Sequence, residues 1–315
     1  MLPLFDDPPS FDRARLAKRL HTLAEQNIWI GTSSWKYEGW CGQIYSRDRY
    51  ATRGRFSQKR FEAECIAEFA ETFPIVCGDF SFYQFPAPQY WERLFNAARG
   101  LHFALKVPED ITVLEFPTHA RYGPRAGMDN PNFLNADLFR SAFTDVLAPW
   151  HNRLGVLIFE FGTFGKRHFE DATEFVRVLD PFLDALPTGI NYSVETRNAE
   201  FLVPVYFDCL RRHNVAHVFN AWSRMPELPV QIAIEDAYTA DFTVTRALLR
   251  QGRPYEEAVK NFSPYEKVQD ENPGARAAIR ELVKQAKERR QASYIFVNNR
   301  LEGNAPVTIE SIVDE

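Results

Sequence analysis

The feature of this sequence that most constrains its fold is an alternation, repeated eight times, between short strand-like runs and stretches with helical periodicity. The runs are rich in β-branched and aromatic residues and occupy residues 28–35, 75–83, 102–107, 155–161, 191–197, 216–222, 241–248 and 293–299. Strands separated by helices pair in parallel, because a helical crossover returns the chain to the same edge of the sheet. Eight such units predict an α/β fold with a single (β/α)8 barrel of the TIM type, and an open doubly wound sheet is the alternative.

The length of the chain agrees with one barrel domain. It has 315 residues, of which 45% are hydrophobic and 25% are charged, a composition typical of a globular protein with a large core. We expect residues 28–315 to form the barrel and residues 1–27 to form an N-terminal extension. An amphipathic helix at residues 11–26 carries an apolar stripe of Leu16, Leu20 and Leu23, which we expect to dock on the barrel.

Composition also indicates the cellular compartment and the kinds of partner to expect. The four cysteines are far apart and form no C-x-x-C pair, which is typical of reduced thiols in a cytoplasmic protein without a structural metal. No apolar stretch reaches the ~20 residues that a membrane span needs, so we expect no membrane association. A net charge of −5 disfavours a protein that holds nucleic acid by bulk charge alone.

Several strand-like runs are polar on one face only. In residues 191–197, Ser193, Glu195 and Arg197 share one face, because side chains along a strand alternate. The run at residues 102–107 places Lys106 on its polar face in the same way. The run at residues 75–83 is expected to turn Asp79 and Tyr83 inwards and Phe80 and Phe82 outwards. In a barrel this face lines the interior, which opens at the carboxyl ends of the strands.

Polar residues lie at the carboxyl ends of all the later runs. They are Asp79, Tyr83, Lys106, Glu160, Glu195, Arg197, Asn220, Arg246, Asn298 and Asn299. We expect them to converge on one cavity in which the cations outnumber the neighbouring acids. A ligand site is the leading interpretation, because barrels of this type carry their chemistry at this end, and a structural ion-pair network is the alternative.

Several motifs resemble those of the YecE-like family, an uncharacterised group of TIM-type barrels. They are "GTSSWKYEGWCGQIY" (31–45), "FSFYQFP" (80–86), "HFALKVP" (102–108), "VETR" (194–197), the arginine of "DFTVTR" (241–246) and "FVNNRLEGNAP" (296–306). The resemblance implies a barrel but no activity, and it implies characteristic roles for Trp35, Trp40, Tyr83, Lys106, Glu195, Arg197, Arg246, Asn298 and Asn299.

This chain departs from the family pattern at several positions, among them Thr112 and Val113, where the family has a threonine–histidine pair. Cys77 replaces a carboxylate, Asp79 replaces an asparagine, Glu160 is an added carboxylate, and an aspartate is missing near Asn220. The departures indicate a divergent member whose chemistry is either altered or lost.

The leading functional hypothesis is a metal- and cofactor-independent enzyme, a hydrolase or lyase, that acts on a small anionic substrate or a phosphodiester. Lys106, Arg197 and Arg246 form an anion clamp in this hypothesis. Glu195 is its base or the residue that orients an arginine, and Tyr83 is its proton donor.

Two alternatives remain open. Glu160 and Glu195 on adjacent strands could instead support glycoside hydrolysis with paired carboxylates. A non-catalytic barrel could bind an anion or single-stranded nucleic acid, with Trp35 and Trp40 stacking on bases, although these aromatic residues could equally pack the first loop over the barrel rim.

Two further segments stand out. Residues 108–131 contain no clear periodicity and predict either a lid, in which Arg121 and Arg125 close over an anion, or a variable surface loop. The helix predicted from Pro273 has a basic face, with Arg276, Arg280, Lys284 and Lys287, which is typical of a solvated exterior.

Overall fold

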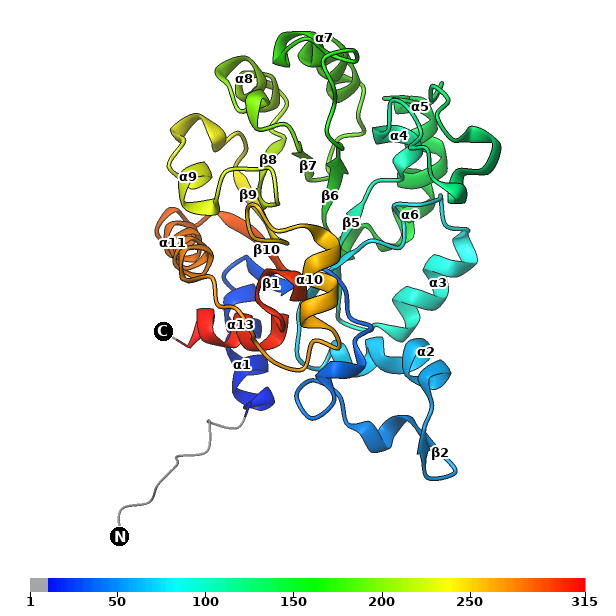
Figure 1. Cartoon of the computed structure of the whole chain (residues 1–315), viewed down its shortest axis with the longest axis vertical. Coiled ribbons are helices and arrows are strands. Elements are labelled where there is room, and N and C mark those ends of the chain that lie inside the picture. The colour runs from blue at the N-terminus through cyan, green and yellow to red at the C-terminus, as the bar shows by residue number, and fades with distance from the viewer. Residues whose placement is uncertain (1–10, 315) are drawn as a thin grey trace.

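The fold is a closed barrel of eight parallel strands surrounded by helices (Figure 1), seen in a computed structural model that describes residues 11–314. The strands lie in the ring order β1-β10-β9-β8-β7-β6-β5-β4. They are β1 (Ile28–Thr32), β4 (Ile75–Gly78), β5 (His102–Lys106), β6 (Leu154–Glu160), β7 (Tyr192–Glu195), β8 (Ala216–Ala221), β9 (Phe242–Ala247) and β10 (Ala292–Val297). The predicted barrel is confirmed, and each of the eight predicted runs overlaps a barrel strand. Residues 1–10 of the predicted extension lie outside the described residues.

The helices form the outer layer. They are α1 (Arg13–Ala24), α2 (Gln58–Phe69), α3 (Pro88–Ala97), α4 (Glu109–Thr112), α5 (Ala136–Phe139), α6 (Asp145–Leu147), α7 (Ala172–Asp184), α8 (Pro204–Arg212), α9 (Leu228–Ile232), α10 (Tyr255–Phe262), α11 (Pro273–Arg289), α12 (Asn299–Glu302) and α13 (Ala305–Val313). Short 3-10 or π turns are η1 (Glu38–Trp40), η2 (Arg47–Tyr50), η3 (Ala120–Arg125), η4 (Arg140–Thr144), η5 (Ala148–Arg153), η6 (Ala199–Phe201) and η7 (Glu235–Ala237). A hairpin of β2 (Ala51–Thr52) and β3 (Arg55–Phe56) was not predicted.

Local sequence explains where the longer helices begin and end. Asn272 caps α11 by accepting a hydrogen bond from the backbone N–H of Ala275, and Arg290 ends the helix in a left-handed conformation. Asp12 caps α1 in the same way through the N–H of Arg15. The segment interrupted by prolines after β8 yields only the five-residue helix α9, because proline removes a backbone donor.

Alternation along the strands separates two cores. Phe103, Leu105 and Val194 point outwards into the large core beneath the helices, whereas Ala104 and Val156 point into the barrel interior. Close strand packing also requires Gly31, since a Cβ atom at this position would lie 2.0 Å from the carbonyl oxygen of Ile75. The apolar interior ends where the polar residues at the carboxyl ends of the strands begin.

The alternation predicted for residues 79–83 is wrong, because β4 ends at Gly78 and the chain turns there. Phe80 packs towards the outer core, as expected. Phe82, which was expected to point outwards, instead lies beneath the Lys106 ammonium group, 3.7 Å from the ring centroid. Tyr83 is 52% exposed and lies at the rim rather than inside the barrel.

The N-terminal helix α1 is part of the outer layer, and it lies beside α13 in Figure 1. Leu16, Leu20 and Leu23 are all buried in the outer core. The backbone N–H of Asp12 also donates to Glu310 of α13 over 3.2 Å. Helix α1 therefore covers the barrel seam where the first and last strands meet. Within residues 11–314, no helix has the length and apolarity that a membrane crossing requires.

Shortening Leu20 to alanine should lower the free energy of unfolding by about 2–5 kcal/mol, because the side chain is fully buried and the substitution leaves a cavity. Lys18→Ala, on the exposed face of α1, is the matched control and should change it by less than about 0.5 kcal/mol. Urea denaturation followed by circular dichroism measures both values. Equal urea midpoints for Leu20→Ala and the wild type would contradict the docking of α1.

Candidate functional site at the carboxyl ends of the strands

The predicted polar residues converge because their strands end in the same layer. Lys106 and Glu160 are the last residues of β5 and β6, and Glu195 is the last residue of β7. Glu160 and Glu195 are register partners, as are Asn220 of β8 and Arg246 of β9. Parallel pairing therefore brings side chains from neighbouring strands to one end of the barrel.

One guanidinium group holds the two glutamates together. The Nη1 atom of Arg246 donates to an Oε2 atom of Glu160 and to an Oε2 atom of Glu195. Arg197 contacts the same pair through Nη2, at 2.8 Å from Glu195 and 3.2 Å from Glu160. The ammonium group of Lys106 lies 3.0 Å from Glu160. We call Lys106, Glu160, Glu195, Arg197 and Arg246 the charged cluster.

Burial decreases from the centre of this cluster to its edge. The side chain of Glu195 is 0% exposed and that of Arg246 is 2% exposed, whereas Glu160 is 15% exposed. Asp79 lies at the edge, 41% exposed, with one carboxylate oxygen 3.7 Å from Lys106 and 3.6 Å from Arg246. The side of Asp79 and Glu160 is therefore the solvent-accessible side of the cluster.

The expectation that cations outnumber acids here is wrong. Three cations, Lys106, Arg197 and Arg246, face three carboxylates, Glu160, Glu195 and Asp79. The added carboxylate at Glu160 removes the excess, because it contacts all three cations. Buried charges of one sign would be costly, so this balance stabilises the barrel end.

The charges also fix the protonation of Glu160. Burial alone would raise the pKa of this carboxyl group, but Lys106, Arg197 and Arg246 outweigh that effect and hold its pKa well below the ordinary value. Burial lowers the pKa of Arg246, and the neighbouring Glu195 and Glu160 more than offset it, so the pKa is raised well above its usual range. Glu160 is therefore a carboxylate at neutral pH and cannot serve as a general acid.

Balanced charge does not mean balanced hydrogen bonding. Within the described residues, the buried Nε atoms of Arg197 and Arg246 and the Nδ2 atom of Asn299 have no hydrogen-bond acceptor, and the buried oxygens Glu195 Oε1 and Asp79 Oδ1 have no hydrogen-bond donor. An arginine offers five N–H donors in a planar fork, and each of these two leaves its Nε donor unused. An acceptor-rich group would satisfy them.

Two aromatic side chains that sequence reasoning missed support the cations. The guanidinium of Arg197 lies 3.7 Å from the ring centroid of Trp222, the same separation as that of Lys106 from Phe82. Trp222 closes the run at residues 216–222, so its place at a strand end was a usable signal. Phe82 gave no such signal, because its orientation depends on the turn after β4.

Three asparagines at the strand ends make structural hydrogen bonds. The Oδ1 atom of Asn298 caps α12 through the N–H of Arg300, and the Oδ1 atom of Asn299 accepts from the indole Nε1 of Trp40 over 3.2 Å. The Nδ2 atom of Asn220 donates to the carbonyl oxygen of Thr196 over 3.0 Å. Among these amides, Asn299 retains a buried donor, its Nδ2 atom, without a partner in the described chain.

The tryptophans of the first loop pack against the rim. Trp40 is fully buried and Trp35 is 5% exposed, with its ring edge-on to Phe80 at a centroid distance of 5.7 Å. Neither ring offers a face for a nucleic-acid base. The structure thus favours packing, the alternative to stacking that the sequence left open.

The segment at residues 108–131 is more ordered in structure than its sequence indicated. It contains α4 and η3, and its two arms join through a bridge between Glu115 and Asp129. Arg121 pairs with Glu109 at 3.2 Å, and Arg125 pairs with Asp110 at 3.0 Å. Both arginines are therefore engaged with acids of α4, and the guanidinium of Arg121 lies over the Tyr83 ring.

One group among the described residues has the composition of a metal site, and it lies between α7 and α8, outside the charged cluster. Asp180, Cys209 and His213 place their potential ligand atoms within 4.8 Å of one another. An Oδ1 atom of Asp180 already accepts from Arg212 at 2.9 Å and contacts His213 Nε2 at 2.7 Å. Burial raises the pKa of Cys209 to about 12, so the thiol stays protonated. The trio is a partly buried, hydrogen-bonded network.

Fold and site together define the class of this protein: a TIM-type barrel whose carboxyl end carries a buried carboxylate–guanidinium cluster. The chain belongs to the DUF72 family of proteins of unknown function, because that family's sequence model matches residues 29–315. Membership in an uncharacterised barrel family, expected from the motifs, is confirmed.

Solved structures agree with this assignment. A DUF72 family protein from Thermotoga maritima is 18% identical, with a TM-score of 0.60 over 91% of this chain and 99% of that chain. A DUF72 family protein from Enterococcus faecalis is 15% identical, with a TM-score of 0.60 over 91% and 98%. At these identities the likeness shows the fold alone. A search of curated proteins found no match.

The depressed pKa of Glu160 makes a prediction about acid stability. A carboxyl group whose pKa is lowered on folding stabilises the protein above its ordinary value of 4.5 and loses that contribution as the pH falls towards the folded-state pKa. Glu160→Gln should therefore lower the free energy of unfolding by about 1–3 kcal/mol near neutral pH. The difference from the wild type should shrink below about pH 4.5.

Urea denaturation at a series of pH values measures this difference, and Glu92→Gln on the exposed face of α3 is the control. A destabilisation by Glu160→Gln that stays constant from neutral to acid pH would contradict the assigned protonation state.

Proposed function

We propose that this protein is a metal-independent enzyme that acts on a small anionic substrate, bearing phosphate or carboxylate, at the carboxyl end of the barrel. The observation that carries the proposal is the pair of buried Nε donors on Arg197 and Arg246 that lack an acceptor in the described chain. Phosphate and carboxylate groups supply several acceptor oxygens in a geometry that a guanidinium fork binds well. A phosphodiester offers the same acceptors.

The substrate anion enters beside Asp79. The two ion pairs of this residue, at 3.6 and 3.7 Å, are longer than hydrogen bonds, and its side chain is the most exposed acid of the site. An anion that displaces Asp79 can contact the ammonium group of Lys106 and the Nη2 and Nε donors of Arg246. Asp79 thus competes with the substrate and sets its affinity.

The two glutamates have different roles in this proposal. Glu195 is fully buried between Arg197 and Arg246, so it positions these guanidinium groups and does not touch the substrate. Glu160 is partly exposed and ionised, which suits a base or a nucleophile acting on the bound substrate. Tyr83 stands at the rim and is the candidate proton donor.

Glycoside hydrolysis fits this geometry less well. That reaction needs one carboxyl group held protonated as a general acid and a second that can reach the sugar. Glu160 is ionised by three neighbouring cations, and Glu195 is inaccessible.

A non-catalytic anion-binding barrel is the second candidate, which shares the binding step with the enzyme and differs from it in turnover. The internal charge balance, with Arg197 paired to Glu195 at 2.8 Å, favours neither of them over a structural ion-pair network.

Binding of inorganic phosphate tests the clamp. Isothermal titration should detect phosphate binding to the wild type, and Arg197→Lys should weaken it about tenfold or more, because lysine lacks the bidentate fork. Arg212→Lys, which changes an arginine paired with Asp180 on the exterior, should leave binding unchanged. Glu160→Gln should strengthen binding, since it removes a competing carboxylate.

A purely structural cluster gives the opposite pattern: no saturable binding by the wild type, and none gained in Glu160→Gln. If binding is found, a screen for turnover of phosphate esters and carboxylate esters distinguishes a catalytic barrel from one that only binds the anion. The enzyme turns over at least one compound and loses that turnover in Glu160→Gln, although this variant still binds phosphate.

A further inference from the structure

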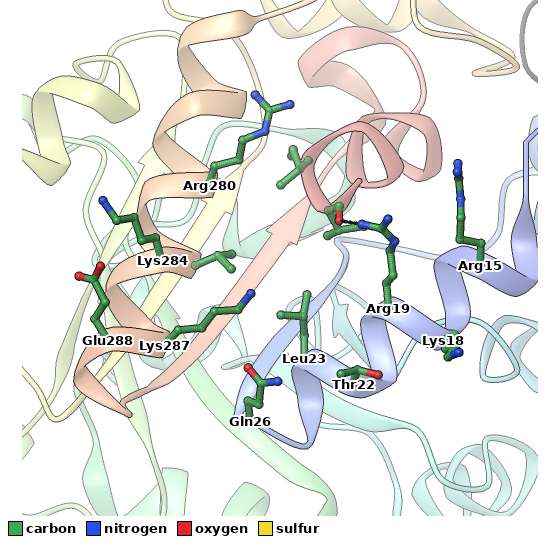
Figure 2. Close-up of a pocket in the computed structure, with 13 residues that line it drawn as sticks. Arg15, Lys18, Arg19, Thr22, Leu23, Gln26, Arg280, Lys284, Lys287 and Glu288 are labelled. Atoms are coloured by element: carbon green, nitrogen blue, oxygen red, sulfur yellow. Dashed lines mark hydrogen bonds between the residues drawn. The ribbon is translucent and has the colours of Figure 1, made fainter. Parts of the chain in front are cut away.

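The outer layer of the barrel has a gap beside α1. Helix α11 has 17 residues, but α13, which contacts both α11 and α1, has only nine. At 1.5 Å per residue, α13 is roughly 12 Å shorter than α11. A groove of about 920 Å³ lies beyond the end of α13, between α1 and α11. Figure 2 shows the two helices on either side of this groove and the end of α13 closing one side.

The floor of the groove is apolar. Leu23 of α1, Val283 of α11, and Ile312 and Val313 of α13 line it. Leu23 and Ile312 are nearly fully buried, so the apolar surface lies in a recess and not on a convex face. A volume of this size falls within the ~300–1,000 Å³ range of ligand sites.

The walls of the groove are basic along their whole length. Lining cations are Arg15, Lys18 and Arg19 on α1, and Arg280, Lys284 and Lys287 on α11. Glu288 is the one acidic residue of the lining. Figure 2 shows Lys287 pointing from α11 towards α1, while Lys284 and Glu288 lie on the outer side of α11. The chain as a whole has a net charge of −5, so the groove is a basic surface on an acidic protein.

Internal partners neutralise only part of this charge. Arg15 and Arg19 pair with Asp314, and Arg280 donates to the carbonyl oxygen of Ser311. Within the described part of the chain, Lys18 and Lys287 have no carboxylate within ion-pair distance, and they lie on opposite walls. The groove therefore offers cations on both sides of an apolar floor.

We propose that this groove docks an acidic amphipathic helix of a partner protein. An apolar stripe on that helix, at spacing i, i+4 and i+7, would pack on the floor, and Asp or Glu residues on both flanks would face the two basic walls. The length from Arg280 to Lys287 corresponds to about two helical turns. This interaction is separate from the function proposed for the barrel mouth.

Other occupants match less of the surface. A fatty acid or lipid carries its charge at one end, whereas the cations here run from Arg280 to Lys287. A flat bilayer cannot reach an apolar floor that lies in a recess. Nucleic acid would use the cations but would leave Leu23, Val283 and Ile312 without a role.

The test uses a fluorescein-labelled peptide of about 14 residues, roughly four helical turns, with leucines at i, i+4 and i+7, glutamates on both flanks and alanine elsewhere. Fluorescence anisotropy with the full chain should show saturable binding that weakens between about 50 mM and about 200 mM salt. A peptide of the same composition with its leucines spread around the helix should bind at least about tenfold more weakly, because it loses the apolar stripe.

Charge reversal on both walls, in Lys18→Glu/Lys287→Glu, should weaken binding about tenfold or more. The matched control, Lys59→Glu/Lys166→Glu, changes two exposed lysines elsewhere and should bind within about twofold of the wild type. Val283→Ser tests the floor separately and should also weaken binding. Circular dichroism melts establish that each variant is folded.

Three results would overturn the proposal: no saturable binding of the amphipathic peptide, equal binding of the peptide with redistributed leucines, or equal loss in the control variant. Vesicles with anionic lipid and a single-stranded oligonucleotide serve as competitors. Displacement of the peptide by either one at matched charge concentration would identify a general polyanion surface and would also overturn it.

Discussion

The contact on which the barrel end depends is the sharing of one guanidinium group by two glutamates. Arg246 reaches across the barrel mouth to Glu160 and Glu195, so three strands are joined through a single ion. Beneath this layer the interior is apolar, with residues such as Val156, Val244 and Phe296. The barrel is therefore closed by hydrophobic packing along most of its length and by charge at its carboxyl end. Loss of one partner would leave the others charged and buried, which is the costly case for an ion pair.

This arrangement separates two properties that are easily confused. The cluster is close to neutral in charge, yet Arg197 and Arg246 each keep an Nε donor without a partner among the described residues. Neutrality explains why such a polar layer is compatible with a stable barrel. The two unused donors are the observation on which the proposed binding of an anion rests. The gradient of burial, from Glu195 to Asp79, gives the site a direction of entry.

Sequence reasoning predicted the barrel and the inward face of β5 and β7, since both depend on alternation, which is a local property of a strand. Lys106, Glu195 and Arg197 were found for that reason. It failed at residues 79–83, because β4 stops at Gly78 and alternation no longer applies to a turn. The charge balance could not be predicted either: the face of Glu160 was ambiguous from sequence, and its three cationic contacts come from β5, β9 and the residues after β7. The groove beside α1 depends on the relative lengths of α11 and α13 in space, which no single segment reveals.

The seam between β1 and β10 has a consequence for the order of events during synthesis. It is fastened beyond the carboxyl ends of these strands by the Trp40–Asn299 hydrogen bond, and before β1 by the contact of Asp12 with Glu310, residues 298 positions apart. Helix α1 is synthesised before every strand of the ring, and α13 is synthesised after all of them. The apolar stripe of α1 therefore has no α13 to pack against until the rest of the barrel has been made.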